Sequence, residues 1–183
     1  MIEPKASRPH MPGYGILDAN SGNGLLPWSW AMERLAKARN YWVATTRPEG
    51  NPHVMPVWGV WLDDAFYFST GAQSRKARNL VENPRCVIGC ELGDDQIVLE
   101  GITELIADPV LRERFSKTYG QKYEWDMEGF DEPFYAVHPT SVFGLSTAPG
   151  AFAGSSTRWV FDPVAQTSVC SVVEFLIKKR RTD

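Results

Sequence analysis

The sequence predicts a mainly β protein, an antiparallel sheet or barrel with flanking helices. At least six segments have the composition of strands, whereas only two or three show helical spacing. The turns between neighbouring strands are short, and short turns join antiparallel strands. The chain has 183 residues, of which 43% are hydrophobic and 22% charged, so it is long enough for a hydrophobic core and ordinary in composition.

The chain opens with an irregular arm followed by one helix. Residues 1–27 are rich in proline and glycine, which predicts an arm rather than an independent domain. Apolar residues then recur at helical spacing, which predicts an amphipathic helix ending near Asn40. These apolar residues are Trp28, Ala31, Met32, Leu35 and Ala38.

Three strands are expected next. Residues 41–46 are short and β-rich, and a turn over residues 47–52 leads into a long strand, residues 53–62, that is apolar on both faces. A tight turn at residues 63–64 returns the chain through residues 65–70, which predicts an antiparallel hairpin.

A second helix is expected over residues 75–82, because Ser74 is a good N-cap and an Asn-Pro pair ends the segment. Asp108 and Pro109 open a third helix, which is expected to run to about Tyr119 and to stop at Gly120. The other expected segments are strands over residues 86–92, 96–106, 141–145 and 158–161, loop or irregular helix over residues 121–138, and a tail of uncertain structure over residues 162–183.

Charge, hydrophobicity and cysteine content limit the kinds of partner and the compartment that we expect. The net charge of −3 and the isoelectric point near 5.7 argue against generic binding to nucleic acid. The longest near-apolar run, residues 54–62, is far shorter than the roughly 20 residues of a membrane helix, and the N-terminus lacks a signal-peptide core. Three cysteines without a CxxC pair fit a reducing compartment. We therefore expect a cytoplasmic protein with no nucleic-acid and no membrane partner.

The most informative segment leads from a hairpin strand into the second helix. Ser69 and Thr70 end the strand, and a turn of small residues leads to Ser74, Arg75 and Lys76 at the helix N-terminus. A helix N-terminus offers free amides and a positive dipole, and the two cations add full charge. These residues indicate a phosphate or carboxylate site, although a solvated helix start with ordinary basic residues explains them equally well.

The strand expected over residues 53–62 is the second candidate. Pro56 cannot donate to a ladder, and Gly59 suggests a bulge, so the strand lies at an edge or is bulged. Free amides beside a flat apolar wall can receive a planar heterocycle with polar edges. A two-sided core strand explains the same apolar run without any ligand.

Motifs for other chemistries are missing. The sequence has no GxxxxGK[ST] phosphate loop, no GxSxG elbow and no HExxH pair. Cys86 and Cys90 are four apart on one strand, which favours buried small side chains over a metal site. The acidic run from Glu124 to Glu132 favours a solvated loop over a lid. The sequence therefore indicates no metal and assigns no catalytic residue.

Residues 28–161 resemble the pyridoxamine 5′-phosphate oxidase-like flavin-binding split barrel. The most specific stretch, residues 58–85, holds a strand, a turn, FSTG, SRKARNL and NPR, and EGITEL over residues 100–105 matches a further barrel strand. The resemblance implies an antiparallel split β-barrel that forms a homodimer with its cofactor at the subunit interface. The site residues that it implies are Met55, Pro56, Val57 and Trp58 along the cofactor ring, and Ser69, Thr70, Ser74, Arg75 and Lys76 around its phosphate.

The chain departs from the vitamin B6 oxidases of that family. Those enzymes have an arginine and a lysine where this chain has Met55 and Val60, and their arginine-rich C-terminal segment is missing here. MPVWGVW is more similar to the branch that uses the deazaflavin coenzyme F420 as a hydride donor. The resemblance thus implies an oxidoreductase that transfers a hydride between F420, or FMN, and an unidentified small organic substrate. A non-catalytic flavin or haem carrier on the same fold and a structural barrel with a decayed site are the alternatives.

Overall fold

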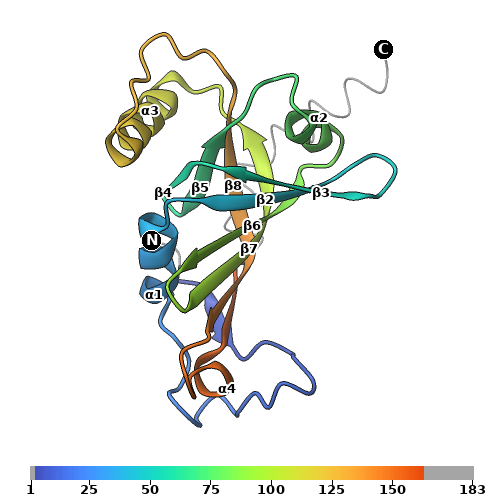
Figure 1. Ribbon diagram of the computed structural model, residues 1–183, viewed down its shortest axis with the longest axis vertical. Helices are drawn as coiled ribbons and strands as arrows, with labels where there is room; N and C mark the ends of the chain where they lie inside the picture. Colours follow the sequence, from blue (N-terminus) through green and yellow to red (C-terminus); the bar gives the residue numbers. More distant parts are fainter. Residues whose placement is uncertain (1–2, 163–183) are drawn as a thin grey trace.

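The computed structural model describes residues 3–162, which form an open antiparallel sheet with helices packed around it (Figure 1). The strand order is β1-β9-β8-β7-β6-β2-β3, and the β4–β5 hairpin joins the sheet through β5 and β8. Every pairing between described strands is antiparallel, which confirms the predicted fold class. The strands are β1 (Lys5–Ser7), β2 (Tyr41–Thr46), β3 (Pro52–Val57), β4 (Gly59–Leu62), β5 (Ala65–Ser69), β6 (Arg85–Leu92), β7 (Asp95–Leu105), β8 (Phe134–Ser146) and β9 (Thr157–Val160). The helices are α1 (Trp28–Lys37), α2 (Arg75–Glu82), α3 (Pro109–Tyr123) and α4 (Phe152–Ser155).

The single long strand expected over residues 53–62 is wrong, because the chain breaks at Trp58 into β3 and β4. β3 pairs with β2, whereas β4 pairs with β5. A Cβ on Gly59 would collide with the Phe66 ring and lie 2.7 Å from the Tyr67 carbonyl oxygen, so only glycine fits where β4 begins. Because β3 has no second strand partner among residues 3–162, the expected edge position of Pro56 is confirmed.

The third helix runs one turn further than expected. α3 continues through Gly120 to Tyr123, and the Trp125 N–H then donates to the Gly120 carbonyl while Glu124 takes the left-handed conformation that ends the helix. A Cβ on Gly120 would lie 2.9 Å from the Trp125 carbonyl oxygen, so this glycine permits the turn rather than stopping the helix.

The remaining differences between the predicted and the observed elements lie near β8 and at the ends of the chain. β8 begins at Phe134 rather than at Ser141, so the loop expected over residues 121–138 is helix at one end and strand at the other. The first residues of β8 pair with β5, a contact between segments far apart in the sequence that local patterns do not reveal. β1 and the short α4 were not expected, α1 ends at Lys37, and the tail from residue 163 onwards lies outside the described residues.

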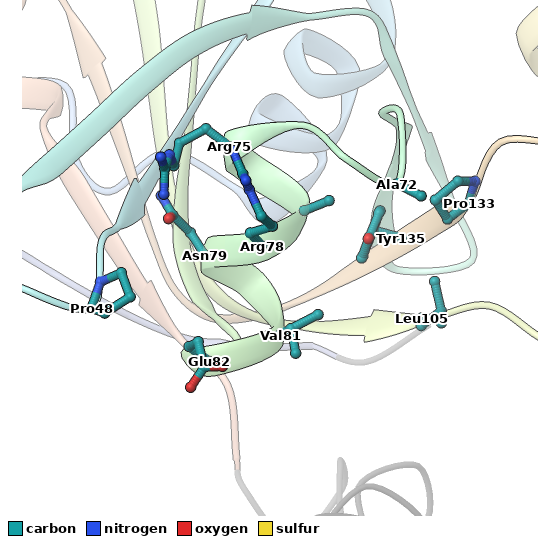
Figure 2. Close-up of a pocket in the computed structure, with 11 residues that line it drawn as sticks. Pro48, Ala72, Arg75, Arg78, Asn79, Val81, Glu82, Leu105, Pro133 and Tyr135 are labelled. Atoms are coloured by element: carbon teal, nitrogen blue, oxygen red, sulfur yellow. The ribbon is translucent and has the colours of Figure 1, made fainter.

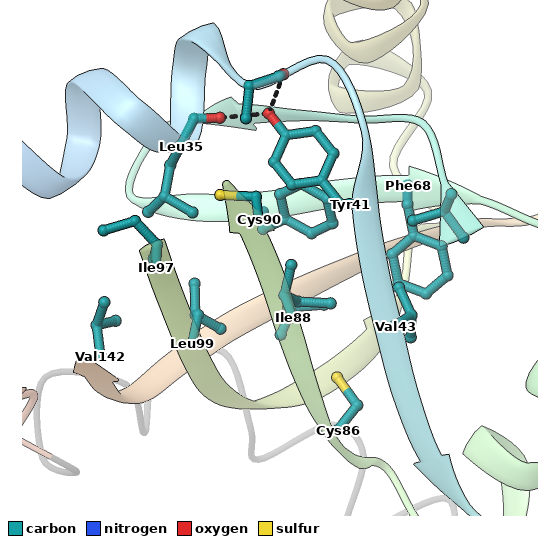
Figure 3. Close-up of a cluster of buried hydrophobic side chains, with 14 of the residues drawn as sticks. Leu35, Tyr41, Val43, Phe68, Cys86, Ile88, Cys90, Ile97, Leu99 and Val142 are labelled. Carbon is teal, nitrogen blue, oxygen red and sulfur yellow. Dashed lines mark hydrogen bonds between the residues drawn. The ribbon is translucent and has the colours of Figure 1, made fainter. Parts of the chain in front are cut away.

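The larger of two core clusters lies on the inner face of the sheet, where α1 packs on it (Figure 3), and a smaller one lies between α3 and strands β4, β5 and β8. Cys86, Ile88 and Cys90 of β6 point to this face, which agrees with buried small cysteine side chains. The Tyr41 hydroxyl hydrogen-bonds to the Leu35 and Ala38 carbonyls and so ties the end of α1 to β2.

The outer face of β2 and β3 is apolar and exposed. Trp42 is 55% exposed and alternates with buried Tyr41 and Val43, and its cross-strand partner on β3 is Pro56. Val54, on the same outer face, is 49% exposed. A large tryptophan in an exposed apolar patch is unusual for a monomer, so this surface suits a protein–protein contact.

Candidate functional site

The turn before α2 is built by hydroxyl groups. Ser74 caps the helix, because its Oγ accepts from the Ala77 N–H at 3.1 Å, which confirms the predicted N-cap. The Thr70 and Ser74 hydroxyls lie 3.1 Å apart, and the Ser74 N–H donates to the Gly71 carbonyl at 2.8 Å. This network fixes the first turn of α2, from which Arg75 and Lys76 project.

Four basic side chains gather around this turn. Burial and, to a smaller extent, the positive charges of Arg47, Lys76 and Arg75 lower the pKa of His53, so each of these three cations acts on the His53 ring. Burial also lowers the pKa of Lys76. Among residues 3–162, no carboxylate forms an ion pair with Arg75 or Lys76. Positive charge without a counter-ion at a helix N-terminus suits an anion.

Buried polar atoms without partners lie beside the cluster. Asn79 is fully buried, and its Nδ2 donates to Thr45 Oγ1 at 2.9 Å, which docks α2 on β2, but its Oδ1 has no hydrogen-bond partner within residues 3–162. Arg47 Nε and His53 Nδ1 are likewise buried without a partner in this part of the chain. Because unpaired buried polar atoms are costly, these three atoms suit a ligand that offers both acceptors and donors.

A cavity of about 510 Å³ adjoins α2 (Figure 2). Figure 2 shows Arg75, Arg78 and Asn79 on one side of it, and Ala72, Pro133 and Tyr135 on the other. The cavity therefore extends from the basic first turn of α2 to the segment that enters β8.

The structure separates the predicted site residues into three groups. Thr70, Ser74, Arg75 and Lys76 share the turn before α2 and its first helical turn. The Ser69 hydroxyl is already engaged, because it donates to the Pro133 carbonyl at 2.9 Å. The predicted ring-binding residues form the third group, in and just after β3.

These ring-binding residues differ in exposure. Met55, on the same face of the hairpin as His53, is 44% exposed, whereas Val57 is buried. Trp58 packs against α3, stacked on Tyr123 with ring centroids 4.7 Å apart. The free surface of this segment is thus offered by Met55 and Pro56, and Trp58 supports it from behind.

Arg47, Thr45 and Asn79 were not singled out in the sequence. Residues 47–52 have the composition of a turn, and a turn pattern does not indicate that Arg47 adds a positive charge near His53. Asn79 carries a usable signal, since asparagine is unfavourable inside a helix and lies four residues after Arg75. Glu132 is exposed, as expected for a solvated loop, and it also accepts a hydrogen bond from the Ala72 N–H.

A second partly buried cation, Lys122, lies behind the β3–β4 junction. Lys122 Nζ donates to the Tyr41 hydroxyl at 2.7 Å and to the Gly59 carbonyl at 3.1 Å. Burial, with a smaller contribution from Arg39, lowers the pKa of Lys122 to about 8. Within residues 3–162, no group of side chains is arranged to hold a metal ion, and no helix is long and apolar enough to cross a membrane.

Comparisons with known proteins agree with the fold. A family model described as pyridoxamine 5′-phosphate oxidase matches residues 31–146, whereas no curated protein matches the sequence. A conserved hypothetical protein from Mycobacterium tuberculosis has 20% identity and a TM-score of 0.61, covering 66% of this chain and 85% of that chain. A structure described as an F420 reductase has 23% identity and a TM-score of 0.52, covering 60% and 93% of the two chains. A haem storage protein from Vibrio cholerae has 17% identity and a TM-score of 0.53, covering 61% and 88%.

Proposed function

Because the chain belongs to the pyridoxamine 5′-phosphate oxidase family, we propose that it is an oxidoreductase that binds coenzyme F420 or FMN through the turn before α2. The observation that carries the proposal is the pair Arg75 and Lys76, which lie at a capped helix N-terminus without a carboxylate partner among residues 3–162. A phosphate group bound there would supply the missing counter-charge.

The residues around the turn fit a sugar-alcohol phosphate ester. Arg75, Lys76 and the hydroxyls of Thr70 and Ser74 would hold the phosphate. The unpaired Asn79 Oδ1 can accept from a hydroxyl group of such a ligand, as a ribityl chain would provide. Both F420 and FMN combine a ribityl chain with a phosphate group.

The ring would lie along the segment from Met55 to Trp58. Among residues 3–162 no strand pairs with the side of β3 that faces away from β2, so the amides on that side can donate to ring carbonyls. Pro56 leaves a gap in that row of donors, and the stack of Trp58 on Tyr123 holds the end of the segment in place. The bound cofactor would supply the hydride, and the chain's own task is to orient the ring and the substrate.

We propose F420 rather than FMN as the cofactor, because the MPVWGVW segment resembles the sequences of the branch that uses F420. The fold likeness to a structure described as an F420 reductase agrees with that choice. The substrate is a small organic molecule, and no side chain is assigned to proton transfer.

A homodimer is part of the proposal. The exposed apolar surface is formed by Trp42 of β2 and by Val54 and Pro56 of β3, and it overlaps the proposed ring-binding segment at Pro56. A second copy packed on this surface would lie next to the ring, which agrees with a cofactor held at the subunit interface.

A non-catalytic haem carrier is the second candidate function. The fold is shared with a haem storage protein, and His53 lies in the basic cluster with an unpaired Nδ1. Burial lowers the pKa of His53, which favours the neutral imidazole, the form that ligates iron.

Titration of the purified protein with F420, FMN and haem, followed by tryptophan fluorescence, tests the proposal. We expect tight binding of F420 or FMN and a loss of about 100-fold in affinity in the double variant Arg75→Ala/Lys76→Ala, because two charge-assisted hydrogen bonds are removed. The matched control, Arg85→Ala/Lys117→Ala, removes the same charge from β6 and α3 and should leave the affinity unchanged.

Unchanged affinity in the Arg75→Ala/Lys76→Ala variant would refute the phosphate assignment. Preference for haem, without turnover of any reductant, would favour the carrier function. Recovery of the absorbance of reduced, bleached F420 or FMN when an acceptor takes up its hydride would establish the oxidoreductase.

A further inference from the structure

A carboxylate lies on the turn before α2. The Ala72 N–H donates to Glu132 Oε2 at 3.1 Å, and both Glu132 oxygens lie 3.7 Å from the position that a Cβ on Gly71 would take. The neighbouring Pro133 carbonyl accepts from the Ser69 hydroxyl, so the loop is held to the turn at two adjacent residues. Ala72 and Pro133 both line the cavity beside α2 (Figure 2).

The position of this carboxylate matters because the turn is otherwise basic. Glu132 uses the backbone amide of Ala72, and it places a negative charge next to Ala72 and Pro133, which line the cavity. A carboxylate repels a phosphate dianion about twice as strongly as a phosphate monoanion at the same distance. The two kinds of phosphate group are therefore affected unequally.

We propose that Glu132 selects the kind of phosphate group that the turn accepts, and that it favours a monoanionic phosphodiester over a dianionic phosphomonoester. This inference rests on the proposed function, since it assumes that Arg75 and Lys76 bind the cofactor phosphate. FMN ends in a phosphomonoester, whereas the phosphate of F420 is a diester. Glu132 is thus a specificity-determining residue for F420 over FMN.

The unpaired Asn79 Oδ1 is independent support for a ligand on this side of α2. It belongs to a fully buried side chain that lines the same cavity as Ala72. A ligand that reaches Asn79 with a hydroxyl group and the first turn of α2 with a phosphate would pass beside Glu132.

Three ligands test the selection. Dissociation constants for FMN, F420 and riboflavin, which has no phosphate, are measured by tryptophan quenching in the wild type and in Glu132→Gln. Glutamine keeps an oxygen that can accept from Ala72 but removes the charge. Glu128→Gln is the matched control, because it removes an exposed acid from the same loop.

We expect Glu132→Gln to lower the ratio of the FMN dissociation constant to the F420 dissociation constant by about threefold to tenfold. This is the effect of removing one repulsive charge roughly 4–6 Å from the phosphate. Riboflavin affinity and the Glu128→Gln variant should not change. Glu132→Ala, which removes the charge and the hydrogen bond together, should change the ratio in the same direction. Because Glu132→Gln keeps the hydrogen bond, a change in both variants would assign the effect to the charge.

An unchanged ratio, or an equal change in Glu128→Gln, would overturn the inference while cofactor binding and its loss in Arg75→Ala/Lys76→Ala kept the proposed function intact. Cofactor affinity that survives Arg75→Ala/Lys76→Ala would overturn the phosphate assignment and this inference together. Failure of the wild type to bind any of the three ligands would do the same.

Discussion

Trp58 lies flat on Tyr123, with ring centroids 4.7 Å apart and ring planes only 4° apart. The Tyr123 hydroxyl accepts from the Gly59 N–H at 2.9 Å, and Lys122 Nζ donates to the Gly59 carbonyl. The end of α3 therefore holds both backbone groups of the residue at which β4 begins. Because the proposed ring-binding segment ends at Trp58, this contact positions it from behind.

Gly59→Ala should destabilise the protein strongly. The added methyl would collide with Phe66 and lie 2.7 Å from the Tyr67 carbonyl oxygen, and neither a buried ring nor a backbone strand can move away freely. Overpacking of this kind costs about 1–3 kcal/mol, and we expect the upper end. Urea denaturation of the free protein measures the change.

Gly71→Ala is the matched control for that substitution. A Cβ on Gly71 has its nearest neighbours, the Glu132 oxygens, at 3.7 Å, an ordinary contact distance. Its free energy of unfolding should stay close to that of the wild type. Equal losses in the two variants would show that the close approach at Gly59 does not determine stability.

Lys122 should make stability rise with pH above about 8. Burial lowers its folded-state pKa to about 8, while the unfolded chain keeps the ordinary value near 10.5. Between these values the unfolded chain holds a proton that the folded protein lacks, so the free energy of unfolding rises with pH. Below pH 8 both states are protonated, and the unfavourable contribution is constant.

Comparison with Lys122→Met isolates this effect from the other groups that face the lysine. These groups are Tyr41, Cys90, Tyr123 and Arg39, which remain in the variant. The difference in the free energy of unfolding, wild type minus variant, should shift in favour of the wild type between pH 7 and 9, by at most about 1.4 kcal/mol per pH unit. A constant difference across that range would contradict the lowered pKa.

Much of the fold could be predicted because it depends on local patterns. The boundaries of β2 and α2 follow from a β-rich run and from the Ser74 cap, and both match the structure. The break at Trp58 could not be predicted in this way. It depends on Phe66 and Tyr123, which come from other strands and helices and meet Gly59 only in the folded chain.

The same distinction between local patterns and tertiary contacts applies to the candidate site. Ser74, Arg75 and Lys76 are adjacent in sequence, so a helix-capping pattern was enough to find them. Arg47 and Asn79 join them only through the docking of α2 on β2, where Asn79 contacts Thr45. Side chains contributed by tertiary packing have no local signature, and the placement of the ring-binding residues stays a prediction.

The two cysteines of β6 should be unreactive in the folded protein. Cys86 and Cys90 are buried, and burial raises the pKa of each thiol to about 12, so almost no thiolate is present at pH 8. A Cys170→Ser variant leaves only these two thiols. We expect Ellman's reagent to label neither thiol in the native protein and both after addition of urea; rapid labelling without denaturant would refute the buried placement.

Trp42→Glu should convert a dimer into a monomer. The wild-type side chain is 55% exposed in the single chain and lies beside Val54 and Pro56, so a partner on this surface would bury it. A carboxylate in its place would have to lose its water without gaining a cation, at a cost of several kcal/mol. Light scattering coupled to size exclusion gives the mass directly.

Val110→Glu is the control for the dimer, because Val110 is an apolar residue on α3, away from the β2–β3 surface, and is even more exposed than Trp42. It should leave the mass unchanged. If the cofactor lies at the subunit interface, Trp42→Glu should also weaken F420 or FMN binding, although Trp42 belongs to neither the phosphate turn nor the ring-binding segment. If Trp42→Glu is monomeric and keeps full cofactor affinity, the whole cofactor site lies within one subunit. If Trp42→Glu remains a dimer, the subunit interface lies elsewhere.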